Sequence, residues 1–111
     1  MKRYCLALDL VNDEKLIAEY ETYHEKVWPE IKKSITDADI VQMEIYRFAN
    51  RLFMILEVGD EFNFAKKAAA DAANPIVQKW EQLMWKYQQA IPGCKPGEKW
   101  VLMDKIFSLA K

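Results

Sequence analysis

The sequence predicts an α+β fold in which the elements follow the order β, α, β, β, α, β. Three observations support this order: an apolar run with period two near the N-terminus, two adjacent β-rich runs in the middle, and helical spacing before and after that pair. Compact domains centre near ~100–150 residues, so a chain of 111 residues fits one of them. We therefore expect a single domain over residues 1–111, built around one core.

The first strand is predicted over residues 3–10, which read RYCLALDL. Its side chains alternate between two sides, one of which holds Tyr4, Leu6, Leu8 and Leu10 and the other Cys5 and Ala7. Apolar residues on both sides indicate a strand whose two faces are at least partly covered. The strand is therefore expected to have a second covered face in addition to its core face.

The segment after this strand predicts a helix that a proline interrupts. Asn12 or Asp13 is a suitable N-cap, and apolar residues then recur at helical spacing at Leu16, Tyr20, Val27 and Ile31. Pro29 lies inside this pattern and disfavours the helical conformation at the residue before it, Trp28. We expect the helix to bend or restart there, with Pro29 as the first residue of a second segment.

Two β-rich runs follow, DADIVQMEIYRF at 37–48 and RLFMILEVG at 51–59. Only Ala49 and Asn50 separate them, which is short enough for a hairpin, although Ala-Asn is a weaker turn signal than Asn-Gly. These runs are the second and third predicted strands.

Residues 60–91 are helical in composition and are broken near Asn74, where Pro75 can open a second helix. That helix is expected to direct five side chains inward: Ile76, Trp80, Leu83, Met84 and Tyr87. A loop with two prolines and two glycines, PGCKPGE, comes next. The alternation over residues 99–109, KWVLMDKIFSL, then predicts the last strand.

This order of elements is the split βαβ or ferredoxin-like arrangement, an antiparallel four-stranded sheet with helices on one face. The second face of the sheet is partly apolar, because it is expected to carry Cys5, Ala7, Phe53 and Ile55. Monomers rarely leave such a patch exposed. The sequence therefore predicts a homodimer through the sheet face, a dimeric α+β barrel.

Composition and charge argue against several classes of partner. The 16 Lys and Arg are spread among 17 Asp and Glu, so no basic stripe indicates nucleic-acid binding. No apolar run approaches the ~20 residues that cross a bilayer, and we find no export signal. Cys5 and Cys94 match neither a zinc pattern nor a disulfide framework. We expect a cytoplasmic protein with no nucleic-acid or membrane partner.

The segment AEYETYHEKVWPEI, residues 18–31, contains the only histidine, His24. Tyr20, His24 and Trp28 follow one another at intervals of four residues, so they lie close to one helix face. A histidine on such a face is often a core residue that donates a ring N–H to a carbonyl, and spacing alone does not separate that role from catalysis. If Trp80 converges on the same region, the rings enclose a cavity suited to a sugar.

The sequence lacks the residue patterns of other catalytic sites. A single histidine excludes a His-rich metal site, and the three glycines form no GxGxxG or other phosphate-binding loop. We therefore expect neither a cofactor nor a metal. The chemistry that remains is proton transfer by His24, helped by Tyr20 or by a carboxylate such as Glu21 or Glu81.

Four segments together resemble the L-rhamnose mutarotase family over most of the chain. They are Tyr20-x-x-x-His24, VWPEI at 27–31, the hairpin with EIY at 44–46 and NRLFMILEV at 50–58, and VQKWEQLM at 77–84. The resemblance implies a cofactor-free, ferredoxin-like homodimer that interconverts the α and β anomers of a 6-deoxyhexose monosaccharide. It also implies that His24 is the proton donor and that Tyr20 contacts the sugar.

Two positions depart from the rhamnose pattern. The family's pair of adjacent tryptophans reads Trp80 and Glu81 here, and a tyrosine of the second strand falls near Met43. Glu81 adds an acceptor for sugar hydroxyls, although a solvated helix glutamate is an equal alternative. The predicted sugar-facing set is Tyr20, Trp28, Met43, Trp80 and Glu81, and L-fucose ranks beside L-rhamnose as substrate. A ferredoxin-like monooxygenase or a sugar-binding module is the alternative.

Overall fold

The computed structural model describes residues 2–110 and has an antiparallel sheet at its centre. Three long strands form it, β1 (Lys2–Leu10), β2 (Ile40–Phe48) and β3 (Arg51–Val58), in the order β2-β3-β1. Two short strands, β4 (Gln88–Gln89) and β5 (Val101–Leu102), pair with the other side of β1. The predicted antiparallel α+β, ferredoxin-like sheet is confirmed.

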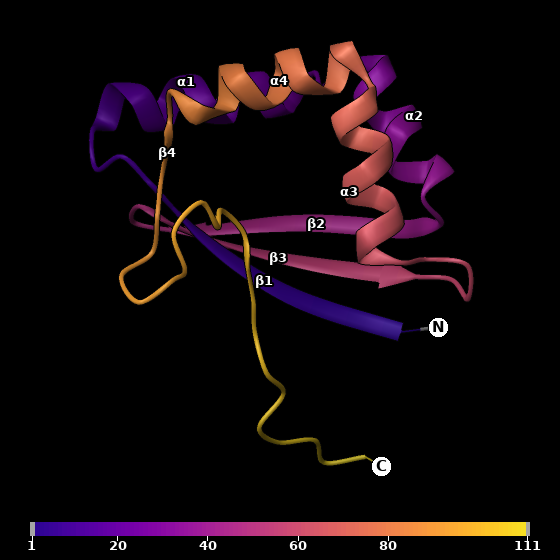
Figure 1. The fold of residues 1–111 in the computed structure, drawn as a ribbon. Helices are drawn as coiled ribbons and strands as arrows, with labels where there is room; N and C mark the ends of the chain where they lie inside the picture. The colour runs from indigo at the N-terminus through magenta and orange to yellow at the C-terminus, as the bar shows by residue number, and fades with distance from the viewer. Residues whose placement is uncertain (1, 111) are drawn as a thin grey trace.

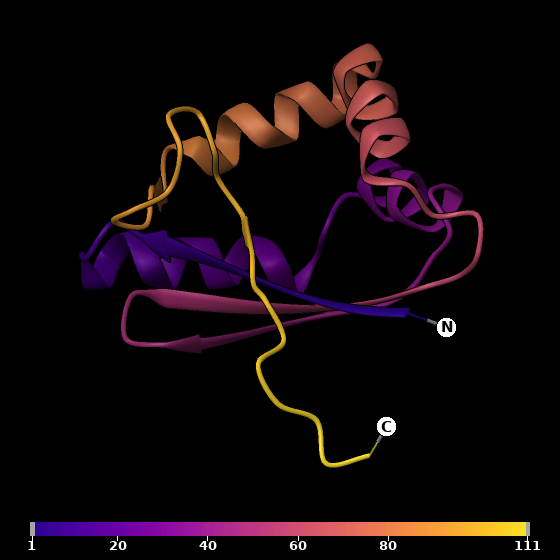
Figure 2. The same cartoon turned by 60° about the horizontal axis from the view of Figure 1, so that its bottom comes forward.

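Four helices cover one face of this sheet, as Figures 1 and 2 show from two directions. They are α1 (Glu14–Glu25), α2 (Pro29–Asp37), α3 (Phe64–Ala73) and α4 (Pro75–Trp85). Within residues 2–110, no helix is long and apolar enough to cross a membrane. The opposite face of the sheet carries no helix in either view, and the C-terminal segment runs down past it.

Both predicted proline breaks are confirmed. Trp28 is extended (φ −55°, ψ 137°), and Pro29 is the first residue of α2. Asn74 is also extended and separates α3 from α4, which begins at Pro75. Proline tolerates the first helical position because the N–H that it lacks has no intrahelical acceptor there. The Asn74 side chain caps α4 by accepting from the backbone N–H of Ile76 at 3.0 Å, and Asp13 caps α1 in the same way.

The predicted hairpin is also confirmed, although its turn sequence is unusual. Ala49 has φ 52°, a left-handed conformation that costs a residue with a Cβ atom free energy. Contacts to β1 compensate for that cost. The backbone N–H of Leu10 donates to the Asn50 carbonyl at 2.7 Å, and the Asn50 side-chain amide donates back to the Leu10 carbonyl at 3.0 Å. The turn is therefore held by the neighbouring strand as well as by its own residues.

The last strand is much shorter than predicted. Within this segment only β5 is strand, and its pairing with β1 ends where the Met103 N–H donates to the Cys5 carbonyl at 2.8 Å. The prediction over 99–109 is therefore wrong for residues 99–100 and 103–109. The sequence pattern was that of a strand, but within residues 2–110 no neighbouring strand pairs with residues 104–109. They leave the sheet as an extended segment.

The end of the second helical stretch also differs from the prediction. Helix α4 ends at Trp85 and does not continue to residue 91. Gln88 and Gln89 instead pair with Leu10 and Asp9 of β1. Ile76 was expected inside the core but is 40% exposed, whereas Val77 is buried. Val77, Trp80 and Met84 follow i, i+3, i+7 spacing, and Ile76 lies about 100° away from that stripe on the helix.

The core lies between the helices and the inner face of the sheet and forms two clusters. One cluster joins α1, α2 and α4 to the sheet through Leu10, Tyr20, Ile31, Leu52, Val77, Trp80, Met84 and Tyr87. The other lies at the opposite end of the sheet and contains Leu6, Ile40, Met54, Leu56 and Val58. The space that these clusters leave between them is the cavity described next.

Candidate active site

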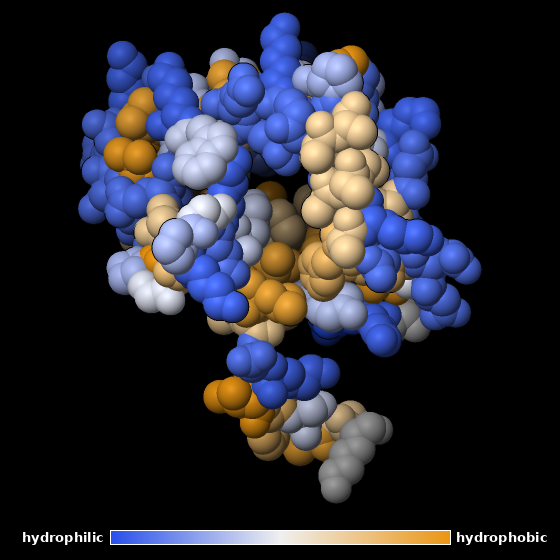
Figure 3. Space-filling model, in the orientation of Figure 1, coloured by the Kyte–Doolittle hydropathy of each residue, from blue (hydrophilic) through white to orange (hydrophobic). Residues whose placement is uncertain are grey.

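A cavity of about 360 Å³ lies between the helices and the inner face of the sheet, and residues of both core clusters line it. Its volume is in the range of small-molecule sites, ~300–1,000 Å³. Figure 3 shows a hollow between the helices and the sheet with hydrophobic residues on its walls. Rings from distant parts of the chain form much of this wall: Tyr20, His24, Phe62, Phe64, Trp80 and Trp100.

His24 lies on this wall between two other rings. Its ring centroid is 4.3 Å from that of Tyr20 and 5.7 Å from that of Trp80, which it meets edge to face. Its Nδ1 atom is 2.8 Å from the Tyr20 carbonyl oxygen. A carbonyl only accepts, so Nδ1 carries the hydrogen. In the neutral imidazole the lone pair therefore belongs to Nε2, the nitrogen available for proton transfer.

Burial determines the charge states of His24 and Tyr20. It lowers the pKa of His24 below its usual value of 6.5, and the hydrogen bond to the Tyr20 carbonyl opposes the shift only in part. Burial also raises the pKa of Tyr20, while a hydrogen bond with the Gln88 side chain lowers it to a smaller extent. Near neutral pH the cavity therefore presents a neutral imidazole beside a neutral phenol.

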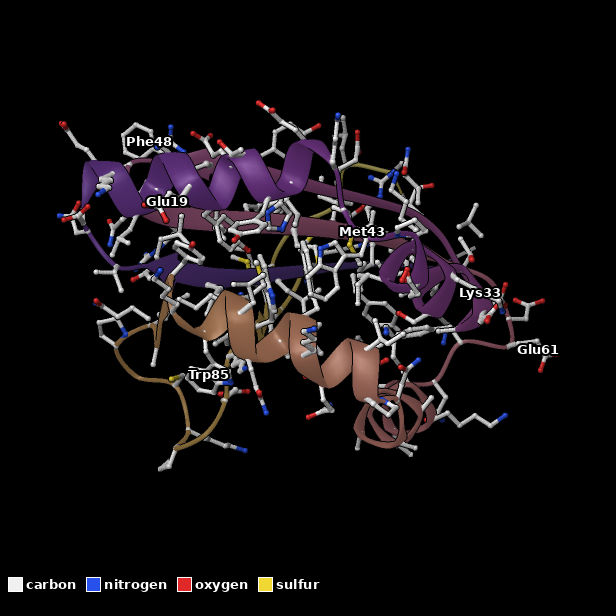
Figure 4. All side chains as sticks on the ribbon, turned by 90° about the horizontal axis from the view of Figure 1, so that it is seen from above. Glu19, Lys33, Met43, Phe48, Glu61 and Trp85 are labelled. Carbon is white, nitrogen blue, oxygen red and sulfur yellow. The ribbon has the colours of Figure 1, made fainter. Side chains whose placement is uncertain are left out.

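Most of the predicted site residues line the cavity. Tyr20 and His24 come from α1, Trp80 and Glu81 from α4, and Met43 from β2. In Figure 4, seen from above, Met43 lies in the space between the α1–α2 pair and the α3–α4 pair, whereas Trp85 lies on the far side of α4. Residues separated by more than fifty positions in the chain thus share one cavity.

Trp28 and Glu21 are located elsewhere. The ring of Trp28 packs edge to face on that of Trp80 at 5.0 Å but does not line the cavity, so its predicted contact with the sugar becomes a supporting contact behind Trp80. Glu21 lies in a smaller depression beside His24, where its carboxylate accepts from the Arg47 guanidinium at 3.1 Å. Of the two carboxylates proposed as helpers, only Glu81 lines the cavity.

Sequence reasoning did not identify several polar residues of the cavity. Lys67 and Asp71 of α3 form an ion pair at 2.8 Å on its wall, and Gln88 of β4 lines it beside Tyr20. Lys67 and Asp71 had a detectable signal, since their i, i+4 spacing favours pairing on one helix face. Gln88 had none, because residues 60–91 were predicted as helix and its position depends on pairing with β1.

Comparisons with known proteins agree with this fold. The profile of the L-rhamnose mutarotase family matches residues 3–109. An L-fucose mutarotase of Xanthomonas campestris pv. campestris is 47% identical over 113 residues, covering 100% of this chain and 90% of the relative. An L-rhamnose mutarotase of Enterococcus faecalis is 32% identical, covering 83% of this chain and 85% of the relative.

Two solved structures share the fold. One is an L-rhamnose mutarotase of Formosa agariphila, with a TM-score of 0.72, 23% identity and coverage of 98% of this chain and 99% of the other. The second is tetracenomycin F2 cyclase of Streptomyces glaucescens, with a TM-score of 0.64, 13% identity and coverage of 100% and 99%. At these identities the likeness shows the fold alone, and the cyclase illustrates that one fold serves different reactions.

These findings define the chain as a sugar mutarotase, an isomerase that interconverts anomers. The chain belongs to the L-rhamnose mutarotase family. The resemblance that the Tyr20, His24 and Trp80 segments indicated is therefore confirmed, and a monooxygenase or a pure binding module is not favoured.

Proposed function

We propose that this protein interconverts the α and β anomers of L-fucose in preference to L-rhamnose, without a cofactor, with His24 as the proton-transferring residue. The observation that carries this proposal is the position of His24. Its Nδ1 is held by the Tyr20 carbonyl at 2.8 Å, and its ring lies on the cavity wall between Tyr20 and Trp80. A ring fixed at one nitrogen is oriented for chemistry at the other.

The reaction moves one proton between two oxygens of the same carbon. Nε2 of neutral His24 takes the proton of the anomeric hydroxyl, and the resulting imidazolium donates it to the ring oxygen as the bond from C1 to that oxygen breaks. The product is the open-chain aldehyde with a hydroxyl at C5. Rotation about C1–C2 and the reverse transfer close the ring as the other anomer. Because both oxygens are bonded to C1, one imidazole nitrogen can serve both, and its donation to the ring oxygen is the predicted donor role.

The walls suit a 6-deoxyhexose. Trp80 offers an indole against which the C–H face of a sugar can stack, and the Glu81 carboxylate offers an acceptor for hydroxyls. Among residues 2–110 the Glu81 carboxylate has only a weak hydrogen-bond partner, the Gln78 amide at 3.5 Å, so it is available to a sugar hydroxyl. The relative named L-fucose mutarotase is 47% identical, against 32% for one named L-rhamnose mutarotase, which favours L-fucose.

A sugar panel tests this preference. Anomer exchange followed by saturation-transfer NMR should be faster with L-fucose than with L-rhamnose or galactose. Glu81→Gln should lower kcat/KM for L-fucose by ~10-fold or more, because a hydrogen bond to a charged acceptor contributes ~1.5–3 kcal/mol. Gln82→Glu is the matched control, since Gln82 is the exposed neighbour on the same helix.

Three results would contradict the proposal. Equal rates on L-fucose and L-rhamnose would remove the substrate preference. Binding of sugar without faster exchange, or oxygen consumption with a phenolic ligand and no effect on anomers, would favour the binding module or the monooxygenase.

The pH dependence follows from the lowered pKa of His24. Transfer begins with the neutral imidazole, which persists below pH 6.5 because burial lowers its pKa. The enzymatic rate is therefore expected to stay constant from about pH 8 downward and to reach half its plateau only below pH 6.5. Exchange rates with the enzyme-free rate subtracted at each pH check this, and a half-plateau point above 6.5 would show that the imidazole is not buried in the working state.

We also propose that the protein is a homodimer through the open face of the sheet. The register places Tyr46, Phe53 and Ala7 side by side across three strands on the face opposite the core, with Ile55 and Cys5 in the adjacent row. Tyr46 is 54% exposed and Phe48, at the end of β2, is 85% exposed. A second copy of the same face would cover this apolar patch, which a monomer leaves in water.

The C-terminal segment supports the same partner. Residues 103–110 pass the open face of the sheet and run beyond it in both views. They present four large apolar side chains, Met103, Ile106, Phe107 and Leu109. At about 3.3 Å per residue, eight extended residues reach roughly 26 Å, more than the ~10 Å between stacked sheets. The segment can therefore cross the interface and cover part of the second copy.

We also propose that the protein is cytoplasmic. Cys5 and Cys94 are both free thiols in the part of the chain that the structure describes. Free thiols are typical of a reducing compartment. This supports the cytoplasm predicted from the spacing of the cysteines.

A further inference from the structure

The ion pair of Lys67 and Asp71 is a charged feature in a cavity wall that is largely apolar. Lys67 Nζ lies 3.0 Å from Asp71 Oδ1 and 2.8 Å from Asp71 Oδ2, and both side chains line the cavity. Each side chain is only 19% exposed. Charges taken out of water lose hydration, and their mutual attraction offsets that loss only when further hydrogen bonds satisfy the remaining hydrogens and lone pairs. A ligand in the cavity can supply those hydrogen bonds.

A second ion pair in the same chain shows that helix stability does not explain this position. Lys33 and Asp37 of α2 have the same residue types at the same i, i+4 spacing, but their side chains are 75% and 61% exposed. A pair of this kind stabilises a helix only slightly, and Lys before the acidic residue is the less favourable order. The Lys67–Asp71 pair brings the same small benefit with most of its surface out of water. Its position therefore indicates a role in the cavity.

The Lys67–Asp71 pair has hydrogen-bonding capacity left for a ligand. An ammonium has three hydrogens, and among residues 2–110 only the two Asp71 oxygens accept from Lys67 Nζ, so at least one hydrogen is free. A carboxylate has about four lone-pair sites, of which Lys67 occupies two. The Gln78 amide donates to the Asp71 backbone carbonyl at 2.9 Å and not to its carboxylate. A donor and an acceptor thus lie 2.8 Å apart in the cavity wall.

This arrangement fits two hydroxyls on neighbouring carbons of a sugar ring. The oxygens of such a gauche diol lie about one hydrogen-bond length apart. Lys67 can therefore donate to one oxygen while Asp71 accepts the hydrogen of the other. Hydrogen bonds to charged groups are roughly twice as strong as neutral ones, and a two-point contact fixes the orientation of the ligand.

The Lys67–Asp71 pair lies on a different side of the cavity from His24. His24 also borders the smaller depression that contains Arg47, whereas the pair borders a separate depression of about 340 Å³ that contains Glu61. Within residues 2–110 these two depressions share no lining residue. Figure 4 shows Glu61 at one end of the molecule and Phe48, the neighbour of Arg47, at the other. A sugar with C1 at His24 therefore directs its far carbons, C3 and C4, toward the pair.

We propose that Lys67 and Asp71 bind the hydroxyls at C3 and C4 of L-fucose and thereby select the configuration at C4. The proposal rests on the function proposed above, in which His24 acts at C1. L-Fucose carries an axial hydroxyl at C4 and L-rhamnose an equatorial one, so two groups held together on one helix cannot receive both sugars in the same way. A polar site built for one hydroxyl arrangement rejects another because its own groups are then left unpaired.

The double variant Lys67→Met with Asp71→Leu removes both charges and leaves neither of them unpaired in the wall. We expect KM for L-fucose to rise about 10-fold or more with a smaller change in kcat, because hydroxyls remote from C1 are bound alike in the ground and transition states. The thermal midpoint should stay near that of the wild type, since apolar residues often replace a buried ion pair without loss. Lys33→Met with Asp37→Leu, at the exposed pair, is the control and should leave KM unchanged.

The C4 epimer of L-fucose, 6-deoxy-L-glucose, tests the selection directly. The two sugars differ only in the C4 hydroxyl, so the kcat/KM of the wild type should be at least about 10-fold higher for L-fucose. In the double variant this ratio should fall toward one, a change that a merely structural role would not produce. Saturation-transfer NMR at several concentrations of each sugar measures both values.

The outcomes distinguish this inference from the function on which it rests. If the wild-type protein does not accelerate anomer exchange of L-fucose, the proposed function itself is wrong. If the wild type is active and the double variant keeps both its KM and the epimer ratio, or melts well below the wild type, the pair is structural and only this inference is overturned. Equal wild-type rates on L-fucose and 6-deoxy-L-glucose would also overturn it.

Discussion

His24→Ala is expected to lower kcat/KM for anomer exchange by ~10²–10⁴-fold, the usual contribution of positioned proton transfer. No other imidazole exists in the chain, and the neighbouring phenol has a pKa raised by burial, which makes it a poor replacement as base. Saturation transfer between the two anomeric NMR signals of L-fucose measures the rate. Because the sugar also mutarotates without enzyme, the variant is compared with an enzyme-free sample.

The variant should remain folded. His24 is on the wall of an existing cavity, and its one side-chain hydrogen bond within the described residues, 2–110, joins it to the Tyr20 carbonyl of the same helix. Loss of such a bond typically costs ~0.5–1.5 kcal/mol, a small part of a domain stability of ~5–15 kcal/mol. Glu25→Ala, at the exposed next position, is the control. If His24→Ala exchanged anomers as fast as wild type, His24 would be the core histidine that its spacing also allowed.

Removal of residues 104–111 is expected to weaken the homodimer by at least ~100-fold in Kd. Three side chains of this segment are largely exposed: Ile106 (96%), Phe107 (77%) and Leu109 (91%). A second copy that covers the segment would bury most of the surface of each. Full burial of one such side chain is worth ~1.5–3 kcal/mol, and ~1.4 kcal/mol changes Kd tenfold. The loss of two of them per chain is therefore enough for the expected change. Sedimentation velocity over a dilution series measures the dimer.

A point variant and a control make this test specific. Phe107→Ser in the full chain should weaken the dimer in the same direction. Trp85→Gln should not, because Trp85 is 50% exposed on the outer side of α4, away from the open face of the sheet. A truncated chain that dimerises as tightly as the full one would place the segment outside the interface. A full chain that stays monomeric at high concentration would show that the homodimer is wrong.

The elements that the sequence predicted best are those in which local geometry is decisive. Pro29 and Pro75 each begin a helix, because the constraint that proline places on its own φ angle and on the residue before it acts within two residues. The period-two pattern of β1 is also local, and its prediction is confirmed. Leu6, Leu8 and Leu10 are buried, and Cys5 and Ala7 are half-buried on the other face.

The predictions that failed depended on a distant partner. The pattern at 99–109 alternates well enough to predict a strand, but only Val101 and Leu102 pair with β1 as strand residues. Gln88 is strand and not helix because Leu10 pairs with it across the sheet. Periodicity describes which faces of a segment are apolar and does not show whether a neighbouring strand is within reach.

The same distinction between local and long-range contacts applies to the candidate site. The sequence by itself determined that Tyr20 and His24 share a helix face, since four residues make about one helical turn, and that the family and its reaction are those of a mutarotase. Only the tertiary structure decided that Met43, Glu81 and Gln88 line the cavity with them and that Trp28 stands behind Trp80. The reason is physical: contacts within one turn follow from backbone geometry, whereas contacts across the cavity follow from how separate elements pack.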